Sequence, residues 1–453
     1  MPTHRTHLSW LGIVRLGLVQ TALGAIVVLT TSTMNRVMVV ELALPAMLPG
    51  ALVGLHYAMQ MLRPRLGHGS DVGGRRTPWI VGGMGVLALG GIGASLATAW
   101  MTHSVFLGTL AAIGAFVLIG LGVGAAGTSL LVLLAKRTAP ERRAAAATIV
   151  WVMMIAGFAI TAGTAGHFLD PFSPARLVTV TAVVATLAFV VAAIAVRGVE
   201  SKGQPAAAAE DTPRPGARAF RQVLAEVWQE SDARRFTIFV FVSMLAYSLQ
   251  DLILEPFAGA VFGMTPGEST KLAGVQHGGT MIGMIVVALA GSGPAMLRVG
   301  SLRGWIFGGC VVSGIALFGL ALAGLMAPAW PIKANVMLLG AANGAFAVAA
   351  IGSMMSLASA GGGAREGIRM GLWGAAQAIA FGVGGFLGTA AADLARLVLG
   401  SPSIAYAVVF LGEGLLFLVS ARLALGIAVP SPARAASESL PSGRRRAALL
   451  TRG

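Results

Sequence analysis

The chain has 453 residues, of which 56% are hydrophobic and only 11% are charged, and its formal net charge is +15. Soluble globular proteins carry about 25% charged residues. The composition therefore excludes an ordinary soluble domain and indicates a protein that crosses the membrane many times.

Long apolar runs recur along the whole chain, each close to the length of about 20 residues that crosses a bilayer. The first run is longer than a cleavable signal peptide, contains Arg15 and lacks a small-residue cleavage site. We predict an all-α membrane protein with twelve transmembrane helices, at about residues 11–33, 44–62, 77–98, 105–134, 146–168, 177–196, 236–260, 270–291, 304–326, 334–358, 369–391 and 403–425.

The basic residues are distributed unequally between the two sides of these predicted helices. If the N-terminus is inside, the inner segments and their flanks hold 27 of the 32 Lys and Arg residues, and the outer segments hold five. Such an asymmetry sets the orientation of membrane proteins. The positive charge is therefore a topology signal rather than a sign of nucleic-acid binding, and we expect both termini to be cytoplasmic.

Polar residues gather at the outer end of the first predicted helix and have a counterpart in the seventh. Ionisable residues at membrane depth are costly and usually face the interior of the bundle in pairs. We predict that Arg36 pairs with Asp251 and Glu255, which share a helix face, and that Pro256 ends the helix just beyond them. In the alternative interpretation, both clusters cap helix ends in the outer head-group layer. The complete predicted polar core is Asn35, Arg36, Glu41, Gln250, Asp251 and Glu255.

The segment between the second and third predicted helices reads Gly-x-x-x-Asp-x-x-Gly-Arg-Arg. It resembles the loop between helices 2 and 3 of major facilitator superfamily carriers, and the resemblance implies a conformational latch between the halves. The residues concerned are Gly67, Asp71, Gly74, Arg75 and Arg76. Val72 replaces the usual basic residue, and Leu297 replaces the Asp in a weaker second copy, so the latch is weakened in the C-terminal half.

Two sets of matching residues within the sequence, each at a fixed offset, indicate a parallel duplication. At an offset of 226 residues, Trp79 corresponds to Trp305, and at an offset of 222, Gly163 and Gly166 correspond to Gly385 and Gly388. Parallel repeats of six helices are the design of major facilitator carriers. We therefore predict an N-terminal six-helix half over 1–196, a cytoplasmic linker over 197–235, a C-terminal six-helix half over 236–425 and a basic cytoplasmic tail over 426–453.

The linker begins as a Pro- and Ala-rich polar stretch and then changes character. Apolar residues from Phe220 to Trp228 recur at helical spacing. This pattern predicts a short amphipathic helix, which lies either along the cytoplasmic membrane interface or against the ends of the bundle.

Several segments of the sequence closely resemble sequences of the PucC family, also called the bacteriochlorophyll-delivery family. They are MNRVMVVELALPA, HYAMQMLRPRLGHGSDVGGRRTPWI, SLQDLILEPFAGAVFG and GVQHGG. Among its branches, the chain is most similar to members linked to bacteriochlorophyll synthesis genes. The resemblance implies a multi-pass protein of the inner membrane of a phototrophic bacterium. It also implies a role in supplying bacteriochlorophyll, or a late precursor, to antenna or reaction-centre polypeptides near the pigment synthase.

Two of the seven histidines, His56 and His277, lie inside apolar runs of corresponding helices. Neutral imidazole is a good metal ligand, so both are candidates to contact the magnesium of a bound pigment. Interhelical hydrogen bonding is the alternative role for each. We predict no metal bound by the protein itself.

The sequence contains none of the motifs of soluble enzymes and no Asp-rich pairs of the kind that hold a magnesium diphosphate. We therefore expect no catalytic activity of its own. Two other functions stay open: a secondary transporter of a small solute working by alternating access, and a non-catalytic subunit of the pigment synthase.

Overall fold

The computed structural model of the chain describes residues 7–63, 75–200, 225–292, 300–359 and 363–427. Regular structure within these ranges is helical. The elements, in chain order, are α1 (Trp10–Val28), η1 (Leu29–Thr33), α2 (Met34–Arg36), η2 (Val37–Glu41), α3 (Met47–Met59), η3 (Gln60–Leu62), α5 (Thr77–Trp100), α6 (Val105–Arg137), η4 (Pro140–Arg142), α7 (Arg143–Phe168), α8 (Pro174–Ala195), α10 (Ser231–Asp251), α11 (Leu254–Phe262), α12 (Pro266–Ser292), α13 (Leu302–Met326), α14 (Ile332–Ser359), α15 (Gly363–Leu399) and α16 (Pro402–Leu425).

Eleven helical stretches among the described residues are long and apolar enough to cross a membrane, which makes this a multi-pass membrane protein. The predicted second span is the exception, because α3 has only 13 residues before the chain tightens into η3. The predicted all-helical membrane fold is confirmed, whereas the number of twelve full-length spans is not.

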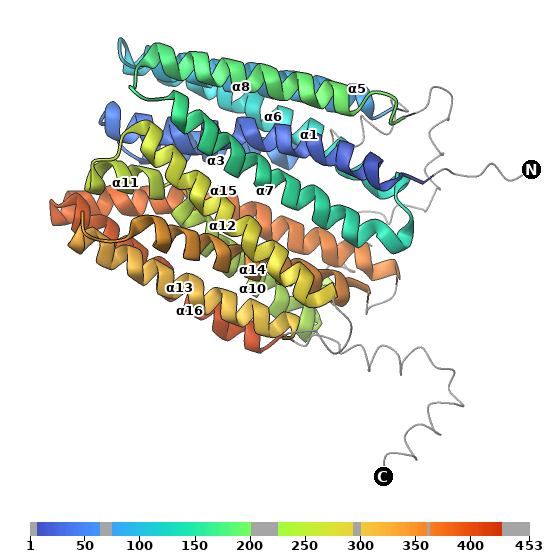
Figure 1. Cartoon of the computed structure of the whole chain (residues 1–453). Helices are drawn as coiled ribbons and strands as arrows, with labels where there is room; N and C mark the ends of the chain where they lie inside the picture. Colours follow the sequence, from blue (N-terminus) through green and yellow to red (C-terminus); the bar gives the residue numbers. More distant parts are fainter. Residues whose placement is uncertain (1–6, 64–74, 201–224, 293–299, 360–362, 428–453) are drawn as a thin grey trace, which may run out of the picture.

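The helices form two bundles that lie side by side (Figure 1). One contains α1 to α8 around its own apolar core, and the other contains α10 to α16 around a second. The bundles meet along two helix pairs, α7 with α12 and α3 with α15. If each half is a repeat of the other, these two pairs are the same contact seen twice, related by a two-fold axis between the halves.

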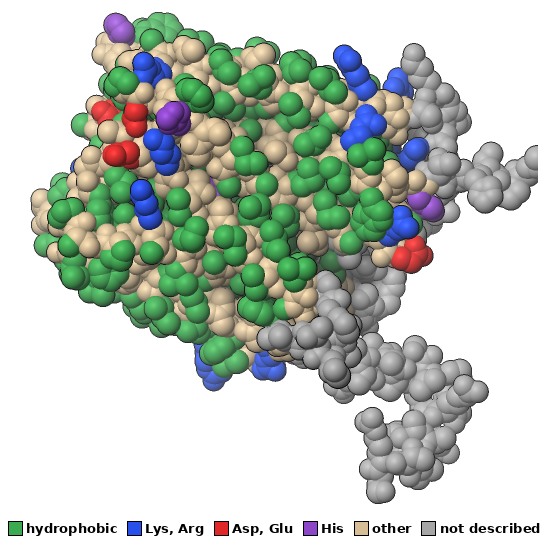
Figure 2. Space-filling model, viewed as in Figure 1, with side chains coloured by type: hydrophobic (Ala, Val, Ile, Leu, Met, Phe, Trp, Pro, Cys, Tyr) green, Lys and Arg blue, Asp and Glu red, His purple; other side chains and the backbone are tan. Residues whose placement is uncertain are grey.

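Charged side chains gather at the two ends of the molecule, and the face between them is mainly apolar (Figure 2). Helix α1 begins and α16 ends at the same end, called here the terminal end (Figure 1). The opposite end, called the distal end, contains η2, the beginning of α3, α11 and the beginning of α12. The apolar belt between the ends is where the hydrocarbon of a bilayer would lie.

Only part of the predicted amphipathic linker helix falls within the described residues. Residues 225–229 form a helical turn in which Val227 is fully buried and Trp228 is 43% exposed. Phe220, Val223 and Leu224 lie outside the described ranges. The next helix, α10, begins at Ser231, five residues before the predicted boundary.

Glycine sets how closely some of these helices approach. A Cβ atom on Gly283 of α12 would lie 2.0 Å from the carbonyl oxygen of Ala341 on α14. Since a backbone atom cannot rotate away, a larger residue must push the helices apart. Gly308 of α13 is different, because nothing lies within 4 Å of its added Cβ.

We expect Gly283→Ala to destabilise the protein by about 1–3 kcal/mol, the usual cost of overpacking a core. Gly308→Ala, the matched control, should be neutral or slightly stabilising because alanine is the better helix former. Thermal unfolding of both variants in mild detergent checks this. Equal melting temperatures for the two variants would contradict the packing argument.

Candidate functional site

The first membrane helix changes its winding where its polar residues lie. Two π-helical turns, Leu29–Thr33 and Val37–Glu41, flank the short α2 segment. π-Helical turns are rare and frequently occur at functional sites. Their wider winding brings the consecutive side chains from Ser32 to Arg36 all into buried positions.

The seventh membrane helix is interrupted beside this segment. Helix α10 ends at Asp251 and α11 begins at Leu254, so the backbone between them is not regularly helical. The carbonyl oxygen of Leu252 accepts a hydrogen bond from the Asn35 amide of the other half. The predicted break is present but lies before Pro256, between Asp251 and Leu254. Pro256 stands in the first turn of α11 and has no N–H to donate to the carbonyl oxygen of Leu252, four residues earlier.

Glu255 is the centre of the contact between the halves. Its side chain is 2% exposed, and its carboxylate accepts hydrogen bonds from the hydroxyl groups of Ser32, Ser269 (3.3 Å) and Thr270 (3.4 Å). The hydroxyl of Thr33 lies 3.1 Å from that of Thr270. One buried carboxyl group therefore ties the first membrane helix to both α11 and α12.

Arg36 does not form the predicted ion pair with Asp251 or Glu255. Its guanidinium group donates to Glu41 at 2.7 Å and to the carbonyl oxygen of Met264 in the other half. Residues five apart come together because the intervening turn is π-helical rather than α-helical. The guanidinium group also lies against Gly259, where an added Cβ would be 2.7–2.9 Å from its atoms.

Asp251 and Glu255 lie in different helices, one on each side of the break at Leu252, and their surroundings differ. Asp251 is only partly buried. Neighbouring Gln250 is buried, and neither polar atom of its side chain has a hydrogen-bond partner in the described part of the chain. The predicted polar core is thus two clusters, one around Glu255 and Arg36 and another around Asp251.

Aromatic rings from both halves surround the second cluster. The ring of Phe381 on α15 lies 5.8 Å from that of Tyr57 on α3 and 5.7 Å from that of Tyr247 on α10. All three rings are partly exposed although their helices lie between the two halves. With Asp251 they make an aromatic and acidic surface, called here the Asp251 surface.

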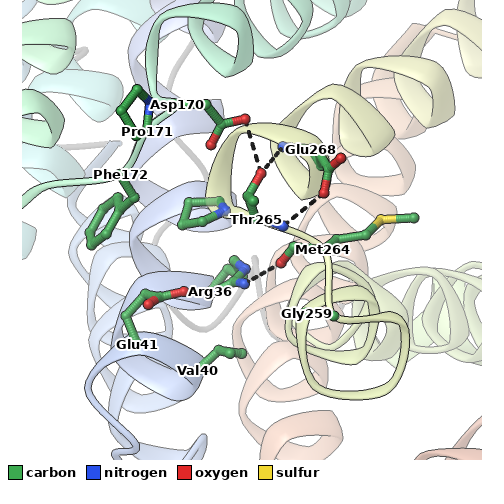
Figure 3. Close-up of a pocket in the computed structure, with 12 residues that line it drawn as sticks. Arg36, Val40, Glu41, Asp170, Pro171, Phe172, Gly259, Met264, Thr265 and Glu268 are labelled. Atoms are coloured by element: carbon green, nitrogen blue, oxygen red, sulfur yellow. Dashed lines mark hydrogen bonds and ion pairs between the residues drawn. The ribbon is translucent and has the colours of Figure 1, made fainter.

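A cavity of about 660 Å³ opens at the distal end beside the first cluster. Figure 3 shows Arg36, Val40 and Glu41 on one side of it, with Thr265 and Glu268 at the beginning of α12 and Asp170 nearby. Its volume lies within the range of small-molecule sites. Three carboxylates and one guanidinium group line it together with apolar side chains such as Phe172 and Met264, so an occupant would meet both charged and apolar walls.

The two candidate histidines are both enclosed. His56 is 1% exposed, and its Nε2 atom is 2.9 Å from the amide of Gln60. His277 is 8% exposed and packs on the ring of Phe158 at 5.0 Å, where α7 meets α12. The Nδ1 atom of each is buried without a hydrogen-bond partner among the described residues. No group of three or more His, Cys, Asp or Glu side chains in the described ranges could hold a metal ion.

Most of the predicted latch falls outside the described residues, namely Gly67, Asp71 and Gly74. Arg75 is exposed, whereas Arg76 is 7% exposed and lies beside Glu200 of the same half. The Glu200 carboxylate accepts hydrogen bonds from the backbone of Arg76 at 2.9 Å and from the backbone and hydroxyl of Thr77 at 2.8 and 2.7 Å. It therefore caps the beginning of α5.

Sequence reasoning missed Glu413, a carboxyl group in the middle of α16. It is 2% exposed, and neither of its oxygen atoms has a hydrogen-bond partner in the described ranges. Its neighbours one turn away on the same face are the fully buried rings of Phe410 and Phe417. The sequence contained a signal for it, because a lone acidic residue in an apolar membrane span is a functional candidate by default.

The sequence matches one known protein family over most of its length. Residues 33–431 match the model of a protein family described as PUCC protein. The chain is 54% identical over 420 residues, 93% of its length and 96% of the relative's, to the bacteriochlorophyll synthase 44.5 kDa chain of Rhodobacter capsulatus. It is 29% identical to protein PucC of Rhodovulum sulfidophilum, covering 85% of this chain and 86% of that one.

Solved structures of transporters share the fold. A D-xylose–proton symporter aligns with a TM-score of 0.70 and 12% identity, covering 92% of this chain and 97% of the other. A bacterial homologue of the lysosomal transporter Spinster, inward-facing and occupied, aligns with a TM-score of 0.65 and 14% identity, covering 93% and 98%. The predicted major facilitator fold is confirmed.

The cap formed by Glu200 generates a pH-dependent prediction. Burial alone raises the pKa of this carboxyl group, but the hydrogen bonds from Thr77 and Arg76 and the charge of Arg76 hold that pKa below its usual 4.5. A carboxyl group with a lowered folded-state pKa stabilises the protein above its unfolded-state pKa, and this contribution is lost as pH falls through the folded value. Glu200→Gln should therefore lower the melting temperature at pH 7, with a gap to wild type that narrows below about pH 4.5. The exposed Glu141→Gln is the control, and a gap independent of pH would contradict the prediction.

Glu413 and Glu255 should respond in opposite ways to the same change. Glu413 has no hydrogen bond to lose among the described residues, and an amide of the same shape carries no charge into the apolar core, so Glu413→Gln should melt at the same or a higher temperature than wild type. Glu255→Gln should melt lower, because an amide has one acceptor oxygen where the carboxylate has two. Thermal unfolding in mild detergent tests both variants, and a large destabilisation by Glu413→Gln would mean that this carboxylate is paired in solution.

Proposed function

Since the chain belongs to the PUCC protein family, we propose that it is an integral membrane factor for bacteriochlorophyll delivery and for assembly of photosynthetic pigment–protein complexes. The observation that carries the proposal is the 54% identity, over nearly the whole of both chains, to a protein named as a bacteriochlorophyll synthase chain. Relatives named PucC are 28–29% identical, so the branch linked to pigment synthesis is favoured.

The cargo in this proposal is bacteriochlorophyll or a late precursor, which the protein passes to antenna or reaction-centre polypeptides close to the synthase. In this proposal the protein lies in the inner membrane, and both of its termini are in the cytoplasm. The excess of Lys and Arg in the segments at the terminal end supports this orientation. The proposed role needs no chemistry of the protein's own, in keeping with a family and fold of non-catalytic membrane proteins.

The Asp251 surface fits such a cargo better than the histidines do. A planar pigment can stack on the partly exposed rings of Tyr57, Tyr247 and Phe381. Carboxylate oxygen is a suitable ligand for magnesium, and Asp251 has no hydrogen bond to another described side chain that would have to break. The Nδ1 atom of His56 has no hydrogen-bond partner among the described residues but is buried, so a role for it as a magnesium ligand requires α3 to move.

A secondary transporter of a small solute is the second candidate. The fold supports it, as does the polar cluster where the first and seventh membrane helices meet, since carriers place their binding sites at the repeat interface. Contribution to the pigment synthase by contact alone is a third possibility, and it predicts co-purification with the synthase without bound pigment.

We expect Asp251→Asn to lower the yield of pigment–protein complexes several-fold while leaving the amount of protein in the membrane unchanged. Glu255→Gln should lower it as well, because the contact between the halves weakens. The measurement is near-infrared absorbance of membranes from cells that produce each variant, normalised to immunoblotted protein.

Glu141→Gln, at an exposed position, is the matched control and should keep wild-type absorbance. Wild-type pigment levels in both Asp251→Asn and Glu255→Gln would remove these residues from the mechanism. Uptake of a small solute into vesicles in response to a proton gradient, with no effect on pigment, would favour the transporter.

A further inference from the structure

Glu413 lies among aromatic rings in the core of the C-terminal half. It stands in the middle of α16, is 2% exposed, and has Phe410 and Phe417 one turn away on the same helix face. Phe410 packs on Phe257 of α11 with ring centroids 5.0 Å apart, and Phe417 packs on Phe346 of α14 at 5.7 Å. The carboxyl group therefore lies where α16 meets the seventh membrane helix and α14.

A second buried polar side chain, Gln250, faces α16 from α10. Helix α15 packs on the other side of α10, where a Cβ added to Gly388 would lie 2.3 Å from the carbonyl oxygen of Leu249. Gln250 instead continues the buried face of Ser243 and Ala246, and α10 packs on α16. It is 1% exposed, and neither its amide oxygen nor its amide nitrogen has a hydrogen-bond partner among the described residues.

A third unpaired group comes from α14. Asn343 is fully buried, and its Oδ1 atom accepts a hydrogen bond from the Ser313 hydroxyl of α13 at 2.8 Å, but its Nδ2 atom has no partner in the described part of the chain. Helix α13 lies against α16 at the same level, since a Cβ added to Gly314 would be 3.0 Å from the carbonyl oxygen of Gly414. Three helices therefore bring unpaired polar side chains to the same depth of one core.

The fold does not require these polar groups. The N-terminal half packs a related core of six helices, and by either offset that relates the halves it has apolar residues or glycine at the corresponding positions. These are Val28 and Gly24 for Gln250, Leu121 and Val117 for Asn343, and Val191 and Leu187 for Glu413. Because an unpaired polar group is costly in such a core, three of them at one level indicate something that they bind.

The basic residues on the helices around Glu413 lie away from the core, near the ends of the molecule where charged side chains gather (Figure 2). In α10, α13, α14, α15 and α16 they are Arg234, Arg235, Arg303, Lys333, Arg365, Arg369, Arg396 and Arg422. The titratable groups nearer the middle of these helices and of α11 are Tyr247, Asp251, Glu255, Cys310 and Tyr406, none of which is a cation. An ionised Glu413 would thus lack a counter-charge among the described residues, and a buried unpaired charge costs far more than a neutral acid.

We propose that Gln250, Asn343 and Glu413 form a hydrated proton-binding site inside the C-terminal half. Ordered water joins the three side chains, and Glu413 holds a proton from solvent as a neutral carboxylic acid. Water both donates and accepts hydrogen bonds, so it satisfies the unpaired N–H groups of the two amides as well as the unpaired oxygen atoms. Buried waters typically make about three such hydrogen bonds. The site is separate from the Asp251 surface and does not depend on what the cargo is.

Infrared spectroscopy of the full chain in mild detergent at neutral pH tests the site, because the C=O stretch of a protonated carboxyl group absorbs apart from carboxylates and amides. Wild type should show a band in this region that Glu413→Gln lacks, with the intensity of a single carboxyl group. In D2O the wild-type band should move to lower frequency, since water in the site exchanges the proton. Glu141→Gln removes an exposed carboxylate and should leave this region unchanged.

Asn343→Leu distinguishes a hydrated site from a dry one. Leucine has about the shape of asparagine but binds no water, so the Glu413 band should move to higher frequency as the acid loses a hydrogen-bonded neighbour. Gln20→Leu is the matched control, because it removes a partly buried amide from α1 in the other half, and it should keep the wild-type band.

Identical spectra of wild type and Glu413→Gln in the acid region would show that Glu413 is ionised and would overturn the proposal. A Glu413 band that neither D2O nor Asn343→Leu moves would also overturn it, because the acid would then be dry. If Glu413→Gln does not fold, wild type and Asn343→Leu decide, and an acid region that is the same in both would contradict the site.

Discussion

The carboxyl group of Glu255 is the interaction on which the arrangement of the two halves depends. It is buried at membrane depth and accepts hydrogen bonds from hydroxyl groups on both halves. A buried carboxyl group that loses such partners costs far more than the net gain from a single hydrogen bond. At this level the halves are therefore held together by a polar contact that lipid cannot replace, beside the apolar packing of Ala273 with Leu29, Ala162 and Ala165.

Two irregularities of the backbone make this contact possible. The π-helical turns of the first membrane helix bring Ser32, Asn35 and Arg36 inward together, and the break before α11 frees the carbonyl oxygen of Leu252 to accept from Asn35. Non-helical backbone at membrane depth persists only where protein satisfies its polar groups. The first and seventh membrane helices thus satisfy polar groups of each other at this level.

The same break separates two kinds of surface. On the distal side are Arg36, Glu41 and the cavity, and on the other are Asp251 and three aromatic rings drawn from both halves. In the proposed role, the second surface would offer a flat, apolar pigment three aromatic rings and the Asp251 carboxylate.

The sequence by itself determined the class of the molecule, its helical content, its internal duplication and its family, because apolar run length, repeat offsets and family phrases are local properties. It also identified the polar residues of the first and seventh membrane helices. Only the tertiary structure decided their partners: Arg36 with Glu41 through a π-helical turn, and Glu255 with three hydroxyl groups. Spacing of four residues predicts a shared face only in an unbroken α-helix, and here the helix is broken one turn before Pro256, whose missing N–H leaves the Leu252 carbonyl without its helical partner. The carboxylates of Asp170 and Asp393, which accept hydrogen bonds at the beginnings of α12 and α3, escaped notice for a related reason, since their partners are backbone N–H groups more than 90 residues away.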